Sequence, residues 1–288
     1  MNSPRELRRR IKSVSGTAQI TKAMQMVAAS KMRKAQQAAI AAVPFAQLMY
    51  RIQRSATARA TDFTHPLQAI RPVQRRAIVL VAADKGLCGA LNTNVFRLAA
   101  QFDPASTVFI TAGRKAAQFV ARSGRKLVAE FAYGDSPAYA ESRAIAALAR
   151  DMFLKGEVDE VQIVATRFVN TLTQVAIAIE YLPVGHITSL RLPGTAIQDS
   201  EDDQMDQALF EPGARNLLAY FMGHYLNFYM YYVLLNAKAS EQSARMVAMK
   251  NATDSAESLI DSLRLEYNKL RQGNITKELL EIAGGQAG

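Results

Sequence analysis

The chain has few of the residues that build metal sites and cross-links. Its 288 residues include one cysteine, three histidines and no tryptophan. The lone Cys88 excludes an intramolecular disulfide and a cysteine-based zinc site. The 15 glycines and 9 prolines are too few for a collagen-like or low-complexity chain. Because the first residues lack the apolar core of a secretory signal, we expect a reducing, cytosolic compartment.

Acidic residues are scarce in one part of the chain only. Residues 1–60 hold 12 lysines and arginines but a single acid, Glu6, whereas residues 61–288 hold 23 basic and 24 acidic residues. The net charge of +10 therefore comes from the first segment. Such a surplus suits nucleic acid, anionic lipid or an acidic protein surface, and it also suits a merely solvated helix face.

The amino-terminal segment has the spacing of a long helix. Helix-forming residues dominate residues 3–59, and apolar or small residues recur every four and three positions, as in a coiled coil. These positions are Leu7, Ile11, Val14, Ala18 and Thr21. We expect Pro44 to kink this helix rather than end it. A helix of about 80 Å, at 1.5 Å per residue, needs a partner along most of its length.

The carboxyl-terminal segment supplies that partner. Residues 215–282 contain no proline, and the same spacing by four and three continues for about eight heptads. The seam positions are Leu217, Phe221, His224, Phe228, Tyr231, Leu235, Ala239, Gln242, Met246, Met249, Thr253, Ala256, Ile260, Leu263, Tyr267 and Leu270. We therefore expect the two terminal helices to pack together.

The middle of the chain alternates strands with helices. The pattern predicts strands at 77–82, 107–111, 126–131, 160–169 and 175–182, with helices at 91–102, 113–122 and 138–154. The last two strands form a hairpin, and the others form a parallel sheet. The fold class is thus an α/β domain inserted between two long terminal helices. We place the segments at 1–59, 75–206 and 212–288, with an acidic surface loop at 199–206.

The turn at 84–92 occupies the place where a dinucleotide-binding domain has its phosphate loop. Gly86 and Gly89 match neither the dinucleotide fingerprint nor the nucleotide-binding loop GxxxxGK[ST]. We expect a tight structural turn here, with Cys88 as a small buried thiol rather than a nucleophile. The sequence shows no paired carboxylates, catalytic triad or metal-binding cluster, so we expect no catalytic site and no cofactor.

Residues 216–237 contain no charged residue and by length could span a bilayer. The segment nevertheless contains Asn216, His224 and Asn227, together with five of the ten tyrosines. Because the coiled-coil spacing also continues through it, we favour a buried or partner-facing helix over a transmembrane one.

Five stretches in four blocks of the sequence resemble the γ subunit of F-type ATP synthases. They are RRRIKSV and QITKAMQMVAASKM at 8–14 and 19–32, ADKGLCGALNTN at 83–94, KASEQSARMVAMKNATD at 238–254, and YNKLRQGNITKELLEI at 267–282. The blocks have the order and spacing of that family and extend over nearly the whole chain.

The resemblance implies the central rotor shaft of the F1 sector. The terminal helices would form an antiparallel coiled coil inside a ring of three α and three β subunits, and the α/β domain would form a foot with the ε subunit on the c-ring. ATP chemistry would occur on the β subunits, so this chain would need no cofactor. It would lie at the cytoplasmic face of a bacterial inner membrane and contact the membrane only through the c-ring. The basic surplus would then face acidic protein rather than nucleic acid.

The resemblance also implies contacts with the β subunits. Met24 would face an acidic lever loop with Lys22 and Lys31 on either side and Arg245 nearby. Arg271, Gln272 and Thr276 would bind a catch loop. If Met24 lies beside Arg245, facing residue numbers in the two helices add to about 269. An alternative interpretation is a free-standing coiled-coil binding module whose α/β domain binds a nucleotide.

Overall fold

We describe the fold from a computed structural model, which covers residues 3–59, 64–184 and 213–285. The chain forms two compact units. One unit, here called the helical unit, comprises Met1–Ala28 and Arg245–Gly288, and the other, the α/β unit, comprises Ala29–Ala244. The predicted acidic loop at 199–206, and with it the end of the segment placed at 75–206, lies outside the described residues.

The two long terminal helices are confirmed. Helix α1 runs over Pro4–Arg59 and helix α5 over Ala214–Gly285, so each continues from one unit into the other. The hydroxyl of Ser3 accepts a hydrogen bond from the backbone N–H of Glu6 at 3.2 Å, which caps the first turn of α1. Helix α1 continues through Pro44, so the proline does not end the helix.

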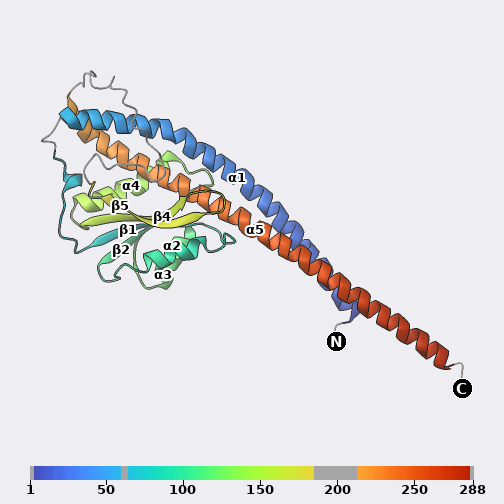
Figure 1. Ribbon diagram of the computed structural model, residues 1–288. Helices are drawn as coiled ribbons and strands as arrows, with labels where there is room; N and C mark the ends of the chain where they lie inside the picture. The colour runs from blue at the N-terminus through green and yellow to red at the C-terminus, as the bar shows by residue number, and fades with distance from the viewer. Residues whose placement is uncertain (1–2, 60–63, 185–212, 286–288) are drawn as a thin grey trace. The chain divides into compact units, whose positions relative to one another are not determined.

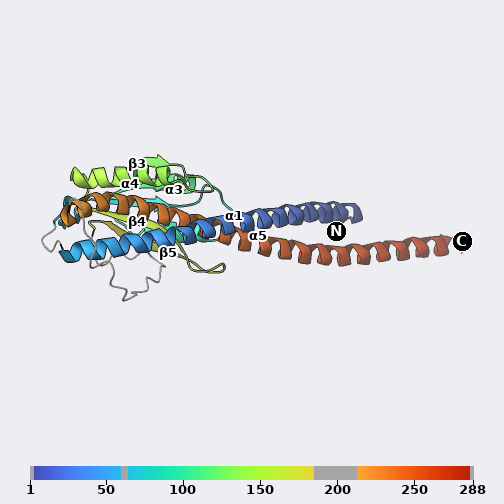
Figure 2. The same ribbon diagram turned by 90° about the horizontal axis from the view of Figure 1, so that it is seen from above.

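In the helical unit, α1 and α5 lie side by side and antiparallel (Figure 2). The Thr21 and Thr253 hydroxyls share a buried hydrogen bond of 2.7 Å. Arg8 donates to the Tyr267 hydroxyl at 2.5 Å, with its guanidinium 5.4 Å from the centre of that ring. The predicted seam is buried at Leu7, Ala18, Thr21, Met249, Thr253, Ala256, Ile260 and Leu263.

The register differs from the expected one. The facing pairs Thr21–Thr253 and Arg8–Tyr267 have residue numbers that add to 274 and 275, instead of about 269. The placement of Met24 directly beside Arg245 was therefore wrong by about five residues. The physical reason is the polar pair in the seam, because the two threonine hydroxyls meet only in the observed register, whereas a shift of five residues leaves each bonded to its own helix alone.

The central sheet has five strands in the order β3-β2-β1-β4-β5. The first four strands in this order are parallel, and β5 pairs antiparallel with β4, which confirms the predicted hairpin. The strands are β1 (Arg76–Val81), β2 (Thr107–Ala112), β3 (Lys126–Phe131), β4 (Glu160–Phe168) and β5 (Gln174–Leu182). The short helices are η1 (Pro66–Gln68), α2 (Leu91–Ala99), α3 (Arg114–Arg122) and α4 (Tyr139–Leu154).

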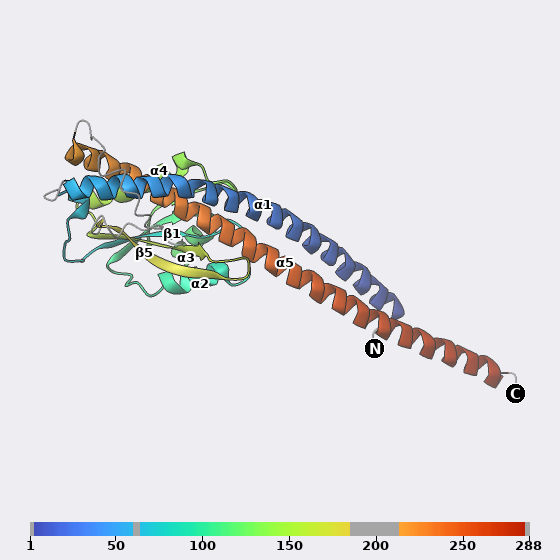
Figure 3. The same cartoon turned by 45° about the horizontal axis from the view of Figure 1, so that its top comes forward.

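Helices cover both faces of the sheet (Figures 1 and 3). Alternate residues of β1 point to opposite sides, as the twofold period of a strand requires. Ile78 and Leu80 pack with α2 and α3, whereas Ala77, Val79 and Val81 pack with α4 and α5. The second core also contains Ala42, Met49 and Ala56 of α1.

The uncharged segment 216–237 is buried within the protein's own fold. It packs against the sheet and α4 and against α1, where the rings of Phe45 and Phe228 lie 4.8 Å apart. Tyr181 of β5 donates a hydrogen bond to the backbone carbonyl of Leu226 at 3.0 Å. Among the described helices, none is long and apolar enough to cross a membrane. One seam position, His224, is exposed and packs on Tyr220 instead.

Alkaline titration should separate the buried tyrosines from the rest. Burial raises the pKa values of Tyr181, Tyr225 and Tyr229. A tyrosine whose pKa is raised by folding contributes stability that is present below pH ~10 and is lost above it. We expect these three side chains to ionise only as the α/β unit unfolds.

Tyrosinate absorbance and helical circular dichroism, recorded on the same samples across the titration, test this expectation. The variant Tyr229→Phe should lose part of the late absorbance step and leave the early step unchanged. Ionisation of all ten tyrosines before any loss of helix would contradict the prediction.

Candidate functional site

The predicted lever contacts in the helical unit differ in exposure. Lys22 is exposed, Met24 is half-buried, and Arg245 is 8% exposed. With the observed register, Met24 lies across from the region of Lys250 rather than from Arg245. Lys22 and Met24 are therefore accessible to a partner on the α1 side, whereas Arg245 is largely enclosed by the fold.

The last turns of α5 carry the predicted catch contacts, and all three are exposed. Arg271, Gln272 and Thr276 face solvent, and the Thr276 hydroxyl donates to the Gln272 backbone carbonyl at 2.9 Å. Pro4, the first residue of α1, lies opposite residues 270–271 in the observed register. Beyond that point α5 has no partner helix among the described residues, and Leu279 and Leu280 are 61% and 68% exposed.

Lys31 is engaged inside the α/β unit. Its ammonium group lies 2.5 Å from the carboxylate of Asp135, which follows β3. Lys22 and Lys31 are nine residues apart, so at 3.6 residues per turn they lie on opposite sides of α1. The other basic side chains of the amino-terminal segment are largely on the surface. Those exposed are Arg5, Arg8, Arg9, Arg10, Lys12, Lys22, Arg33, Lys34 and Arg51.

The carboxyl edge of the sheet is where an open α/β sheet binds ligands, at the point where the strand order reverses. Here that point lies between β1 and β4, and α5 fills it. Ala244 of α5 packs on Ala83, Cys88 and Leu91 of the turn after β1. The Ser243 hydroxyl donates to the backbone carbonyl of Thr171, beyond β4, at 2.7 Å.

The turn after β1 is the structural turn that the sequence predicted. Leu87 and Gly89 have φ values of 63° and 59°, and the Asn92 side chain accepts the backbone N–H of Ala83 at 3.1 Å. Cys88 is buried, and the Asn92 amide points at its sulfur from 3.4 Å. With α5 in the crevice, this geometry disfavours the interpretation of a nucleotide-binding module.

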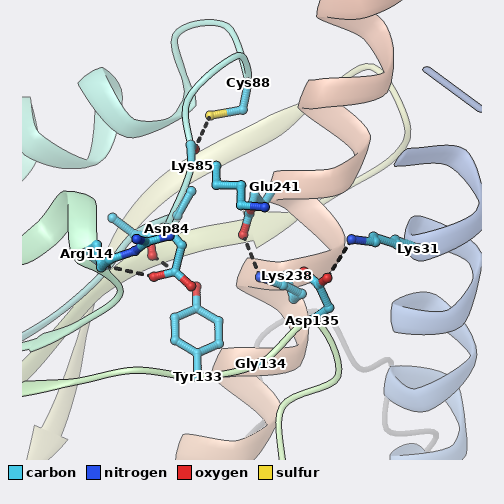
Figure 4. A network of polar contacts seen from close by, with 12 residues as sticks. Lys31, Asp84, Lys85, Cys88, Arg114, Tyr133, Gly134, Asp135, Lys238 and Glu241 are labelled. Atoms are coloured by element: carbon cyan, nitrogen blue, oxygen red, sulfur yellow. Dashed lines mark hydrogen bonds and ion pairs between the residues drawn. The ribbon is translucent and has the colours of Figure 1, made fainter. Parts of the chain in front are cut away.

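A network of charged side chains lies where α5 crosses this edge (Figure 4). The Lys238 side chain is 3% exposed and lies 3.4 Å from Asp135 and 3.1 Å from Glu241. Its ammonium group also lies 5.0 Å from the centre of the Tyr133 ring. The hydrogen bond from Lys31 lowers the pKa of Asp135, the charge of Lys238 acts in the same direction, and partial burial opposes both.

Sequence reasoning missed this network. It assigned Lys31 to the β subunits and gave Lys238, Glu241 and Asp135 no role. The available signal was the spacing of Lys238 and Glu241, which are three residues apart on one helix and flank the seam position Ala239. Nothing in the local pattern indicated Asp135, because its contacts come from residues about a hundred positions away.

Comparison with known proteins supports the family resemblance. A family model described as ATP synthase matches residues 3–288. The ATP synthase gamma chain of Opitutus terrae is 44% identical over 99% of this chain and 98% of its own length. That of Desulforamulus reducens is 40% identical over 100% and 99%.

Solved structures show the same fold. A chain of the Euglena gracilis mitochondrial ATP synthase, from the assembly with F1 and the c-ring, has a TM-score of 0.67 at 20% identity and is matched over 99% of this chain and 93% of its own length. One from the central stalk and c-ring of the Tetrahymena thermophila enzyme has a TM-score of 0.59 at 24% identity, over 81% and 99%. With both termini and the inserted domain matched at this identity to bacterial relatives, the chain belongs to the family of ATP synthase gamma chains.

Proposed function

We propose that this chain is the central rotor shaft of the F1 sector of a bacterial ion-translocating ATP synthase. The observation that carries the proposal is the 44% identity to a gamma chain over 99% of the sequence. The antiparallel α1–α5 pair of the helical unit agrees with a shaft enclosed by other subunits, as does the end of α5, which no other described residue covers. Rotation of the c-ring would turn this chain, which would drive the β subunits in turn through their nucleotide states.

The proposal assigns the chemistry to partner subunits. ATP would form or hydrolyse on the β subunits of a ring of three α and three β subunits, and this chain would contribute no catalytic group or cofactor. The α/β domain would contact the ε subunit and the c-ring. The chain would thus be a peripheral subunit at the cytoplasmic face of the inner membrane.

Two surfaces would contact the β subunits. Exposure of Arg271, Gln272 and Thr276 supports their assignment to a catch loop. Exposure of Lys22, beside the half-buried Met24, supports the assignment of this part of α1 to an acidic lever loop. Lys31 and Arg245 would act at the edges of the lever contact, since Lys31 also binds Asp135 and Arg245 is mostly buried.

Co-purification tests the proposed function directly. A tagged copy of the full chain, expressed in its own host, should recover two large subunits in equal numbers, together with ATPase activity. Recovery of the chain alone under conditions that keep membrane complexes intact would reject the proposal.

Reversing the charge of Lys22 should weaken coupling between ATP hydrolysis and ion pumping. Lys22→Glu would place a like charge opposite the acidic lever, and an exposed pair is worth less than about 1 kcal/mol, so we expect a graded loss. Ions pumped per ATP in inverted membrane vesicles give the measurement. The exposed Lys34→Glu carries the same charge change in the same helix and is the control.

Lys31→Glu is a poor test of the lever, because it also places a carboxylate against Asp135. Wild-type pumping per ATP in Lys22→Glu would count against the assignment of Lys22. A loss of equal size in Lys34→Glu would attribute the effect to net charge rather than to the lever contact.

A further inference from the structure

Polar contacts at the carboxyl edge of the sheet tie together three separate parts of the α/β unit. Asp135 lies in the loop between β3 and α4 and binds Lys31 of α1 through one carboxylate oxygen and Lys238 of α5 through the other. Lys238 in turn pairs with Glu241 at 3.1 Å (Figure 4). One acidic side chain thus connects both long helices to the α/β domain.

Two of the four charged side chains in this network are too deeply buried to exchange partners with water. The side chains of Lys238 and Glu241 are 3% and 4% exposed. A buried charge that loses its partner is strongly destabilising, so any rotation of α5 against the sheet that separates these groups is opposed. Asp135, at 55% exposure, completes the network from the solvent side.

Neutral contacts on either side of the network hold the same stretch of α5. The Tyr133 hydroxyl donates to the backbone carbonyl of Ala82 at 3.1 Å, which fixes the ring beside Lys238. Ser243 and Ala244 contact the segments beyond β4 and β1. Residues 238–244 of α5 therefore contact the segments that follow β1, β3 and β4.

The remaining contact between α5 and the α/β domain is apolar. Between 218 and 237 the helix packs mainly through leucine, methionine and aromatic side chains. Apolar burial is strong but not directional, whereas hydrogen bonds weaken steeply when their geometry changes. The polar contacts of residues 238–244 thus set the orientation of α5 on the sheet.

We propose that Asp135 is a positioning residue for torque transfer, which locks α1 and α5 to the α/β domain so that the three turn as one body. The proposal rests on the rotor function proposed above. In it, the ligand crevice of an open α/β sheet serves as a socket for the protein's own helix. Loss of the Asp135 contacts lets the α/β domain shift on the helices within the reach of its chain connections, a displacement here called slip, while the catalytic cycle on the β subunits continues.

The slip is measurable in the isolated full-length chain. Spin labels at the exposed positions Gln37 in α1 and Ala144 in α4, in a Cys88→Ala background, report the distance between the helix and the domain. We expect one narrow distance distribution for the otherwise wild-type chain. Asp135→Lys, which repels both lysines, should increase the population of displaced distances by about tenfold. Adding Lys31→Glu should narrow the distribution in part, because it re-forms the ion pair with α1 while Lys238 still opposes the new lysine.

A matched control lies at the opposite edge of the same sheet. Arg76 and Glu160 form an ion pair of 2.5 Å between β1 and β4. The double variant Arg76→Met, Glu160→Gln removes a comparable pair from the domain interior and should leave the distance distribution narrow. Equal broadening in this control, or no broadening in Asp135→Lys, would overturn the proposal.

The functional consequence is measured in the assembled enzyme. Asp135→Lys should retain the ATP hydrolysis rate of the detached F1 sector and lower the number of ions pumped per ATP against an ion gradient, because a domain that is displaced on the helices within the reach of its connections transmits torque less stiffly. If Asp135→Lys broadens the distance distribution of the isolated chain but leaves the ions pumped per ATP unchanged, the Asp135 contacts do not take part in torque transfer. If the wild-type chain does not assemble with large partners, the rotor function itself fails, while the distance measurement still reports the lock.

Discussion

Replacing Arg271 by alanine should lower the ATP turnover of the assembled complex by about tenfold or more, with no change in the stability of the isolated chain. A charge-assisted hydrogen bond contributes roughly 1.5–3 kcal/mol, and each 1.4 kcal/mol changes a rate by about tenfold. Arg271 is exposed in the isolated chain, so its removal costs no internal packing. Gln272→Ala should act in the same direction by a smaller amount, because its hydrogen bond is neutral.

Steady-state ATP hydrolysis by the purified complex and thermal unfolding of the isolated chain give the two measurements. Arg264→Ala is the matched control, because Arg264 is an exposed arginine two turns earlier whose described contact is Asp261 on its own helix. Normal turnover in both Arg271→Ala and Gln272→Ala would reject the assignment of these residues to a catch contact. If Arg264→Ala lowered ATP turnover as much as Arg271→Ala, the loss would be due to the removed positive charge rather than to a specific contact.

The end of α5 should exchange its amide hydrogens freely in the isolated chain and become strongly protected in the complex. From residue 271 to Gly285 the helix extends about 20 Å beyond the residue that faces Pro4, at 1.5 Å per residue. An unsupported helix of this length is marginal in water. Its exposed side chains, Ile275, Leu279 and Leu280, are 44%, 61% and 68% exposed and would be covered by the surrounding subunits.

Hydrogen exchange on the free chain and on the complex tests this expectation, with residues 249–263 as the internal control. That stretch carries the buried seam of the helical unit, so its amides should be protected in both samples. We expect opening free energies near zero at 271–282 in the free chain, rising toward those of the seam on assembly. Strong protection of 271–282 in the free chain would show that another part of the chain already covers this helix.

Local sequence patterns were enough to predict the helices and strands. The strands and helices of the α/β domain follow from local hydrophobic periods and from turns, so all five expected strands were found within one or two residues of their predicted bounds. The coiled-coil spacing marked the buried face of α5 from Met249 to Leu263, whereas nearly every residue between 225 and 243 is buried whether or not it lies on the seam. The catch contacts at 271–276 stay a prediction that rests on a short contiguous motif. Their exposure at the end of a helix is equally local.

The contacts between these elements could be read only from the folded chain. A seam that repeats every seven residues permits several registers of α1 against α5. The hydrogen bond between the Thr21 and Thr253 hydroxyls forms in one of them, and because the two residues are 232 positions apart, no local pattern indicates that they meet. The tyrosine-rich segment is uncharged because the sheet and α1 cover it from different sides, which no single helical period reveals. The contact of Lys31 with a partner subunit stays a prediction, and the fold gives Lys31 a contact that the sequence did not indicate, with Asp135 in a loop 104 positions away. A side chain's own neighbours in sequence fix its secondary structure, whereas the partner of a long flexible cation depends on which carboxylate the fold brings within reach.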